Sequence, residues 1–288
     1  MAAEIKIVEC PRDAMQGIKE WIPTEAKVRY INQLLRVGFD TIDFGSFVSE
    51  KAVPQMKDTA EVLRKIDLSS AKSRLLAIVA NQRGAETACE FDEIQYLGYP
   101  FSISETFQMR NTNASIEESL IRVAEIADLC IRHKKEPVIY ISMGFGNPYG
   151  DAWSPEIAIN WSERLYREFG IRILALSDTI GVATPQSIKT LFSALIPALP
   201  EVEFGAHLHT TIDKAQEKIE AAYLAGCRRF DGAIKGYGGC PMAADELTGN
   251  MPTEQMVDYF RLNGNDVGLD GSEFNAAMNL ANVTFPIH

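Results

Sequence analysis

Val138-Ile139-Tyr140-Ile141-Ser142-Met143 and Ile173-Leu174-Ala175-Leu176-Ser177 are two short apolar runs with the length and composition of buried strands. Between them, Ser154-Pro155 places an N-cap hydroxyl before a proline that fits the first position of a helix. The stretch therefore predicts a strand, a crossover helix and a second strand. Such a unit pairs its strands in parallel, because the helix returns the chain to the same end of the sheet.

The same alternation continues toward both ends of the chain. Ser115 and Glu118 have the spacing of a capping box, and Thr184-Pro185 repeats the helix-start signal. We expect eight strands, at residues 5–9, 41–44, 74–80, 93–97, 138–143, 173–177, 202–209 and 229–234. Further helices are expected at residues 24–37, 55–65, 214–225 and 253–261.

Eight strands in strict alternation with helices favour an α/β fold that closes into a TIM (β/α)8 barrel over an open, doubly wound sheet. No Gly-x-Gly-x-x-Gly follows the first expected strand, so a dinucleotide-binding fold lacks its main signature. We predict a single TIM-barrel catalytic domain over residues 1–288, with the active site at the carboxyl ends of the strands.

The composition indicates a soluble protein that acts on small molecules. Hydrophobic residues make up 46% of the chain, and their longest runs are too short for a membrane span. A net charge of −11 disfavours nucleic acid and anionic membranes as partners, because both repel an acidic surface. Five cysteines without paired spacing, and an N-terminus without an apolar signal segment, indicate a cytoplasmic protein.

His207 and His209 are the sharpest pair of candidate functional residues. Side chains two positions apart on a strand point the same way, so both imidazoles would face the barrel mouth. Two hydrogen-bonded histidines at a strand end are the simpler interpretation, but Asp13, after the first strand, would complete a metal-binding set. We predict a divalent cation, Mg²⁺ or Mn²⁺ first, with Zn²⁺ or Co²⁺ as alternatives.

Other polar residues follow the expected strands, and most have two interpretations. Asp43 and Asp178 would either bond the backbone at the strand ends or orient substrate and metal ligands. Asn81 follows the third strand and is a candidate for substrate binding. Cys240 lies in the glycine-rich loop after the last strand, where a mobile segment would bring a proton donor over the substrate.

With these residues located, the chain resembles the 3-hydroxy-3-methylglutaryl-CoA lyase family of metal-dependent TIM barrels. The resemblance covers nearly the whole chain. It rests on Pro11-Arg12-Asp13-Ala14-Met15-Gln16, Ser46-Phe47-Val48-Ser49, Asn113-Ala114-Ser115-Ile116-Glu117-Glu118-Ser119, Asp178-Thr179-Ile180-Gly181-Val182, His207-x-His209, and Gly238-Gly239-Cys240-Pro241 with Gly249-Asn250. The cysteine loop is typical of the lyases, since the related condensing enzymes lack this cysteine.

The resemblance implies retro-Claisen cleavage of an acyl-CoA to acetoacetate and the enolate of acetyl-CoA, in a homodimer. The cation would lower the pKa of the substrate hydroxyl. Arg12 would stabilise the enolate, and His207 or Cys240 would protonate its carbon. The implied roles are catalysis by Arg12, Asp43, Asp178, His207 and Cys240, substrate binding by Arg12, Gln16 and Asn81, and metal binding by Asp13, His207, His209 and Asn250.

The chain departs from the family pattern at positions that we expect in the walls of the site. The family has arginine at the start of its fifth strand and serine on its sixth, so a charge and a hydroxyl are missing here. The departures are Asp43, Val138, Met143, Asn147, Ala175 and Thr210. They leave the metal-binding set intact but affect substrate recognition. The alternatives are a related aldolase or condensing enzyme acting on another hydroxy or oxo acid, and a catalytically silent barrel.

Overall fold

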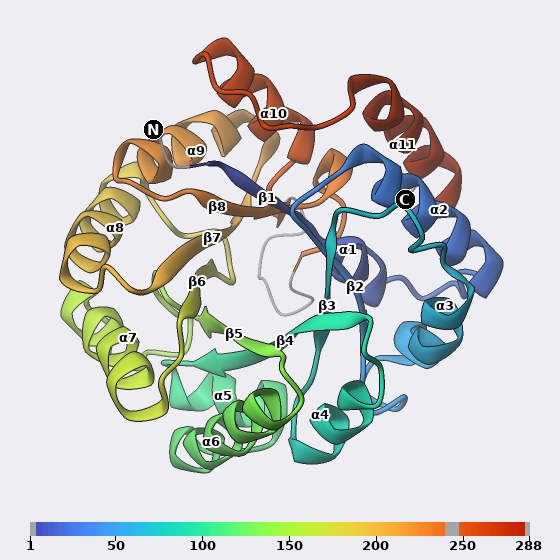
Figure 1. The fold of residues 1–288 in the computed structure, drawn as a ribbon. Coiled ribbons are helices and arrows are strands. Elements are labelled where there is room, and N and C mark those ends of the chain that lie inside the picture. The colour runs from blue at the N-terminus through green and yellow to red at the C-terminus, as the bar shows by residue number, and fades with distance from the viewer. Residues whose placement is uncertain (1–3, 240–247, 286–288) are drawn as a thin grey trace.

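The computed structural model describes residues 4–239 and 248–285. Its strands are β1 (Lys6–Glu9), β2 (Thr41–Ser46), β3 (Arg74–Ile78), β4 (Ile94–Ser102), β5 (Glu136–Ser142), β6 (Ile173–Asp178), β7 (Glu203–Thr210), β8 (Arg229–Gly232) and β9 (Gly249–Asn250). The strands β1 to β8 pair in parallel around a ring that closes between β8 and β1 (Figure 1). The predicted TIM barrel is confirmed. The short strand β9 is antiparallel to β7.

Most helices form a ring outside the barrel, whereas α1 lies inside this ring beside β1 and β2, and α11 packs against α2 (Figure 1). The α-helices are α1 (Pro11–Gln16), α2 (Thr24–Val37), α3 (Thr59–Lys65), α4 (Gln82–Cys89), α5 (Glu105–Thr112), α6 (Ile116–Arg132), α7 (Pro155–Phe169), α8 (Pro185–Ala198), α9 (Ala215–Leu224), α10 (Thr253–Leu262) and α11 (Gly271–Thr284). Three 3₁₀ turns are η1 (Pro54–Met56), η2 (Ile212–Lys214) and η3 (Ile234–Gly236). Within the described ranges, the helices lack the length and apolar character that crossing a membrane requires.

The predicted helix starts are confirmed at three places. Ser115 and Glu118 form both hydrogen bonds of a capping box, and the hydroxyls of Ser154 and Thr184 accept from N–H groups in the first turns of α7 and α8. The expected helix at residues 55–65 is instead divided into η1 and α3. The Thr59 hydroxyl donates to the Met56 carbonyl at 2.8 Å, so it satisfies a backbone group where the helix would otherwise continue.

Strand β4 extends past residue 97, where we expected it to end. Gly98 and Pro100 are usually read as strand breakers, but here both lie inside the strand. A Cβ atom on Gly98 would come within 2.6 Å of Ile78 Cδ1, so a glycine is needed for the barrel interior to pack. Strands β3 and β8 end two residues earlier than expected, and β2 continues to Ser46.

Side chains inside the barrel lie in two layers that matter for the site. The lower layer contains the register neighbours Tyr140, Ala175, Gly205 and Arg229. The upper layer contains Ser177, His207 and Asp231, two residues further along three of the same strands. Below the site, the interior is filled mainly by an apolar cluster of Leu76, Ile78, Tyr96, Val138, Tyr140, Ile173 and Ala175.

The Glu9 side chain links the end of β1 to segments that follow β8. Its carboxyl group is fully buried at the end of β1 and accepts from the Ile234 N–H at 2.8 Å and the Thr253 hydroxyl at 2.6 Å. Burial raises the pKa of Glu9 from 4.5 to about 8. The Thr253 hydroxyl is able to accept as well as donate, so a protonated Glu9 retains both contacts.

A Glu9→Gln variant is expected to resist unfolding better than the parent at pH 9. The folded pKa lies above the ordinary one, so Glu9 stabilises the fold below about pH 4.5, and this stabilisation is lost as the pH rises through about 8. Between pH 6 and pH 9 the parent should lose on the order of 2 kcal/mol more than the variant. Urea unfolding at both pH values measures this difference, and parallel pH dependences of the two proteins would refute it.

Candidate active site

A cavity of about 290 Å³ opens at the carboxyl ends of the strands, where the prediction placed the active site. One side of it is polar and comes mainly from α1, β6 and β7. The polar residues are Arg12, Asp13, Gln16, Ser177, Thr179, His207 and His209. The other side is largely apolar and includes Val48, Ala52, Val53, Ile78, Ala80, Pro100 and Phe107.

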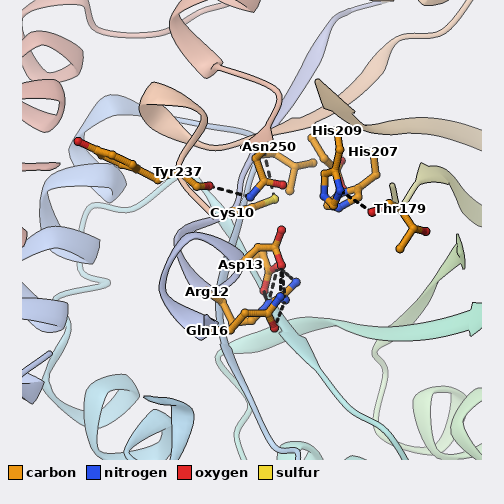
Figure 2. A network of polar contacts seen from close by, with 12 residues as sticks. Cys10, Arg12, Asp13, Gln16, Thr179, His207, His209, Tyr237 and Asn250 are labelled. Atoms are coloured by element: carbon orange, nitrogen blue, oxygen red, sulfur yellow. Dashed lines mark hydrogen bonds and ion pairs between the residues drawn. The ribbon is translucent and has the colours of Figure 1, made fainter. Parts of the chain in front are cut away.

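Asp13, His207 and His209 converge on one point in this cavity (Figure 2). Potential ligand atoms of the three residues all lie within 4.8 Å of one another. Asp13 is carried by α1, which starts directly after β1 with Pro11 in the first turn. His207 and His209 are two residues apart on β7, so the expected common orientation of their rings is observed.

The hydrogen bonds of both histidines leave the same ring atom available. His209 Nδ1 lies 2.9 Å from the Thr179 carbonyl oxygen, which is able only to accept, so Nδ1 carries the proton. His207 Nδ1 lies 3.2 Å from a carboxylate oxygen of Asp231. In its neutral form each ring therefore presents Nε2 as its lone-pair atom, and His209 Nε2 is buried without a partner among the described residues.

Asp13 is also in the form that a metal ion requires. Its Oδ1 accepts from Arg12 Nη1 at 2.9 Å and from Gln16 Nε2, whereas Oδ2 is buried and has no partner in the described part of the chain. Burial opposes ionisation, but Arg12, the two histidines and the Asn250 side chain together outweigh it and lower the pKa of Asp13. Burial lowers the pKa of His209, which favours its neutral form.

Asn250 lies beside these three residues, on β9 opposite His209 (Figure 2). Its amide nitrogen donates to the Tyr237 carbonyl at 2.8 Å, which leaves the amide oxygen as the remaining acceptor, and its side chain also interacts with Asp13. Two imidazole nitrogens, a carboxylate oxygen and an amide oxygen form a donor set that suits a divalent cation. The residues present therefore fit the predicted metal ion.

Arg12 is held by two carboxylates next to the metal-binding set. Its Nε contacts both carboxylate oxygens of Asp43, at 3.0 and 3.2 Å, and its Nη1 donates to Asp13 and Gln16. Together with a bond from Nη2 to Asp43, these contacts occupy four of the five guanidinium N–H groups. Burial raises the pKa of Asp43 to about 6, so this carboxylate is ionised at neutral pH.

Asp178 and Asn81 do not line the cavity. Alternation along β6 turns Asp178 outward, where its carboxylate accepts from Lys218 of α9 at 2.8 Å. The same lysine donates to the His209 carbonyl at 2.7 Å, so we infer that Asp178 positions β7 from outside the barrel. Asn81 is the N-cap of α4 and accepts from the Gly84 N–H at 2.9 Å. Both residues therefore have structural roles: Asp178 holds Lys218 against β7, and Asn81 caps α4.

The glycine-rich loop reaches the site from above α1. Gly238 has a φ of +81°, and a Cβ atom at this position would lie 2.5 Å from the Asp13 carbonyl oxygen. Only glycine fits both the backbone conformation and the close approach. Cys240, the catalytic candidate on this loop, lies outside the described residues.

None of the six departures from the family pattern is among the residues that line the cavity, where we expected them. Val138 and Ala175 belong to the apolar layer beneath the site. The Met143 N–H donates to the Thr179 hydroxyl at 2.8 Å, and Asn147 organises the following turn by bonding to Tyr149 and Asp151. Val138 and Ala175 face the barrel interior, but they lie too early on β5 and β6 to reach the cavity, which only the last inward-facing side chains of the strands line.

Three residues near the site were not assigned a role from the sequence. Asp231 is buried and orients His207, and its position in a strand end left its role open. Lys218 and Arg229 are buried charges that pair with carboxylates on other elements. Basic residues in a helix or at the start of a strand usually face solvent, so the sequence contained no signal that would have identified them.

The comparison with known proteins now identifies the family. The model of the HMGL-like family matches residues 4–281. The chain belongs to the HMGL-like family. Its HMGL-like relatives include the cytoplasmic 3-hydroxy-3-methylglutaryl-CoA lyase of Rattus norvegicus, which is 36% identical over 92% of this chain and 77% of the relative. Since these relatives are HMG-CoA lyases, which cleave a carbon–carbon bond, this HMGL-like chain is a carbon–carbon lyase.

Two solved structures show how closely the HMGL-like barrel is preserved. The HMG-CoA lyase of Bacillus subtilis superposes with a TM-score of 0.91 at 33% identity, covering 99% of this chain and 95% of that one. An HMG-CoA lyase of Acinetobacter baumannii, in complex with coenzyme A and 3-methylmalate, superposes with a TM-score of 0.89 at 30% identity. That match covers 99% of this chain and 93% of the other.

Proposed function

We propose that this HMGL-like chain cleaves 3-hydroxy-3-methylglutaryl-CoA, or a close analogue, to acetyl-CoA and acetoacetate with the help of a divalent cation. The observation that supports this most is the convergence, next to His207, of two buried atoms that have no partner within residues 4–239 and 248–285, Asp13 Oδ2 and His209 Nε2. The names of the rat and Bacillus subtilis relatives describe this activity, and the Acinetobacter baumannii structure contains coenzyme A.

A bound Mg²⁺ or Mn²⁺ would supply a Lewis acid for the hydroxyl and carboxylate oxygens of the substrate. The chain itself supplies the charge that stabilises the product enolate. Arg12 retains one N–H of Nη2 for a substrate oxygen, and its bonds to Asp43, Asp13 and Gln16 fix its orientation before substrate binds. A donor held in this way loses little entropy when negative charge develops on the thioester oxygen.

We assign protonation of the enolate carbon to Cys240 and not to His207. Both ring nitrogens of His207 have other roles: Nδ1 donates to Asp231, and Nε2 belongs to the proposed metal-binding set. The Cys240 thiol, in the glycine-rich sequence after β8, is the remaining candidate for a proton donor. We also propose a single catalytic domain over residues 1–288, a homodimer and a cytoplasmic location, as the sequence analysis predicted.

Purified protein loaded with Mn²⁺ is expected to release acetoacetate and acetyl-CoA in equal amounts from 3-hydroxy-3-methylglutaryl-CoA. Removing the ion with EDTA should stop the reaction, and adding Mg²⁺ or Mn²⁺ should restore it. Parallel assays with other hydroxy and oxo acids separate this outcome from the alternatives, because an aldolase or a condensing enzyme would release an aldehyde or a 2-oxo acid from those substrates only. Full ion binding without turnover would refute the substrate assignment and leave the metal site standing.

A further inference from the structure

Arg229 is a fully buried cation inside the barrel, below the proposed metal site. It lies on β8, two residues before Asp231, and its side chain is 1% exposed. Its Cδ lies 3.2 Å from the point where a Cβ atom of Gly205 would be, and the Cβ of Ala175 lies 3.6 Å from the same point. Small residues on β6 and β7 therefore leave the room that the arginine side chain occupies.

Only one edge of the Arg229 guanidinium has hydrogen-bond partners in the described part of the chain. Nη1 donates to Glu203 Oε1 at 3.1 Å and lies 3.8 Å from Asp40 Oδ1, near the lower rim of the barrel. Nε and Nη2 are buried without partners. Glu203 is also paired with Lys6, so its charge is already balanced by a second cation. The contacts at the lower rim therefore do not explain why the Nε and Nη2 groups of Arg229 are buried.

Two residues further along β8, on the same face of the strand, Asp231 is a buried carboxylate that also lacks a full set of partners among the described residues. Asp231 is 2% exposed and contacts His207 Nδ1 through Oδ2, whereas its Oδ1 has no partner among the described residues. The opposite charges of Asp231 and Arg229 stabilise one another. The hydroxyl of Tyr140, whose ring packs edge-on against His207, is a further buried group without a partner.

We propose that Arg229 is a positioning residue: its charge holds the Asp231 carboxylate in the orientation that fixes the His207 ring for metal binding. A buried carboxylate without a nearby cation is strongly destabilised, and among interior positions of the described chain Arg12 is already shared by Asp13 and Asp43. This inference rests on the metal site of the proposed function.

The test measures Mn²⁺ affinity in Arg229→Met, in Asp231→Asn and in the double variant. We expect each single variant to bind Mn²⁺ about tenfold more weakly than the parent, the usual effect of losing a group that orients a ligand. Because Arg229 acts through Asp231, the double variant should bind about as weakly as Asp231→Asn alone. The matched control is Arg228→Met, since Arg228 donates to backbone carbonyls outside the site and should retain parental affinity.

Metal-free unfolding of the same proteins separates positioning from simple stabilisation. If Arg229→Met loses stability in EDTA but binds Mn²⁺ as tightly as the parent, the proposal is wrong. It is also wrong if the two losses of affinity add in the double variant. Should Arg229→Met not fold, Arg229→Gln carries the same comparison, because an amide still reaches toward Glu203 without the charge. A parent protein that binds no Mn²⁺ would contradict the proposed function instead.

Discussion

Replacing His209 with alanine is expected to lower acetoacetate release by roughly a hundredfold or more and to weaken Mn²⁺ binding to a similar degree. The substitution removes Nε2, the buried ring atom whose only apparent use is to bind an ion. The effect should be large because no other described side chain is positioned to replace this ligand. Isothermal titration with Mn²⁺ and an assay of acetoacetate measure the two losses independently.

His133→Ala is the matched control for this experiment. His133 is exposed at the end of α6 and does not line the cavity. Its loss should therefore leave ion binding and turnover unchanged. A His209→Ala protein with parental Mn²⁺ affinity would show that the three converging residues do not form the metal site. Parental affinity combined with lost turnover would give His209 a role in chemistry but not in ion binding.

Replacing Arg12 with glutamine is expected to reduce kcat by about a hundredfold to a thousandfold, because the substitution removes the charge that stabilises the enolate. The same change should lower the free energy of unfolding by about 3–5 kcal/mol, since it leaves the fully buried Asp43 without its cation. Steady-state kinetics and urea unfolding at neutral pH, where Asp43 is ionised, measure the two effects.

The Arg12→Gln/Asp43→Asn double variant distinguishes the two roles of Arg12. An amide at position 43 removes the unpaired charge, so we expect most of the lost stability to return while turnover stays low. Recovery of turnover together with stability would mean that Arg12 acts only by supporting the fold. Full activity in Arg12→Gln alone would remove Arg12 from the chemistry.

The sequence predicted the barrel and the His207–His209 pair because both depend on local periodicity. Alternation along one strand is enough to place two side chains on one face, and eight repeats of strand and helix leave few topologies. The same alternation also predicts that the Asp178 side chain faces outward. Ala175 and Ser177 face inward, so Asp178, which follows Ser177 directly, faces the helices. Whether a residue occupies an odd or an even position along the strand was therefore a better guide to the direction of its side chain than its closeness to the strand end.

The buried charges could not have been predicted in this way. Lys218 lies on a helix, and Arg229 follows another arginine at the start of a strand, so both have the local sequence of surface residues. Their partners, Asp178 for one and Glu203 for the other, come from different strands of the closed barrel. A pairing of this kind depends on the register between strands, which no single segment of the sequence specifies.

The two hydrogen bonds of Glu9 tie the beginning of the chain to its end, and the proposed ion-binding residues lie on either side of this tie. Asp13 follows Glu9 closely, and Asn250 closely precedes Thr253. During synthesis, the ion site would therefore be completed last, after the C-terminal part has left the ribosome and closed against β1. A chain that ends before β9 would retain most of the barrel wall and an incomplete set of ligands. Binding of the ion would then report that the chain extends at least through β9 and that the barrel is closed.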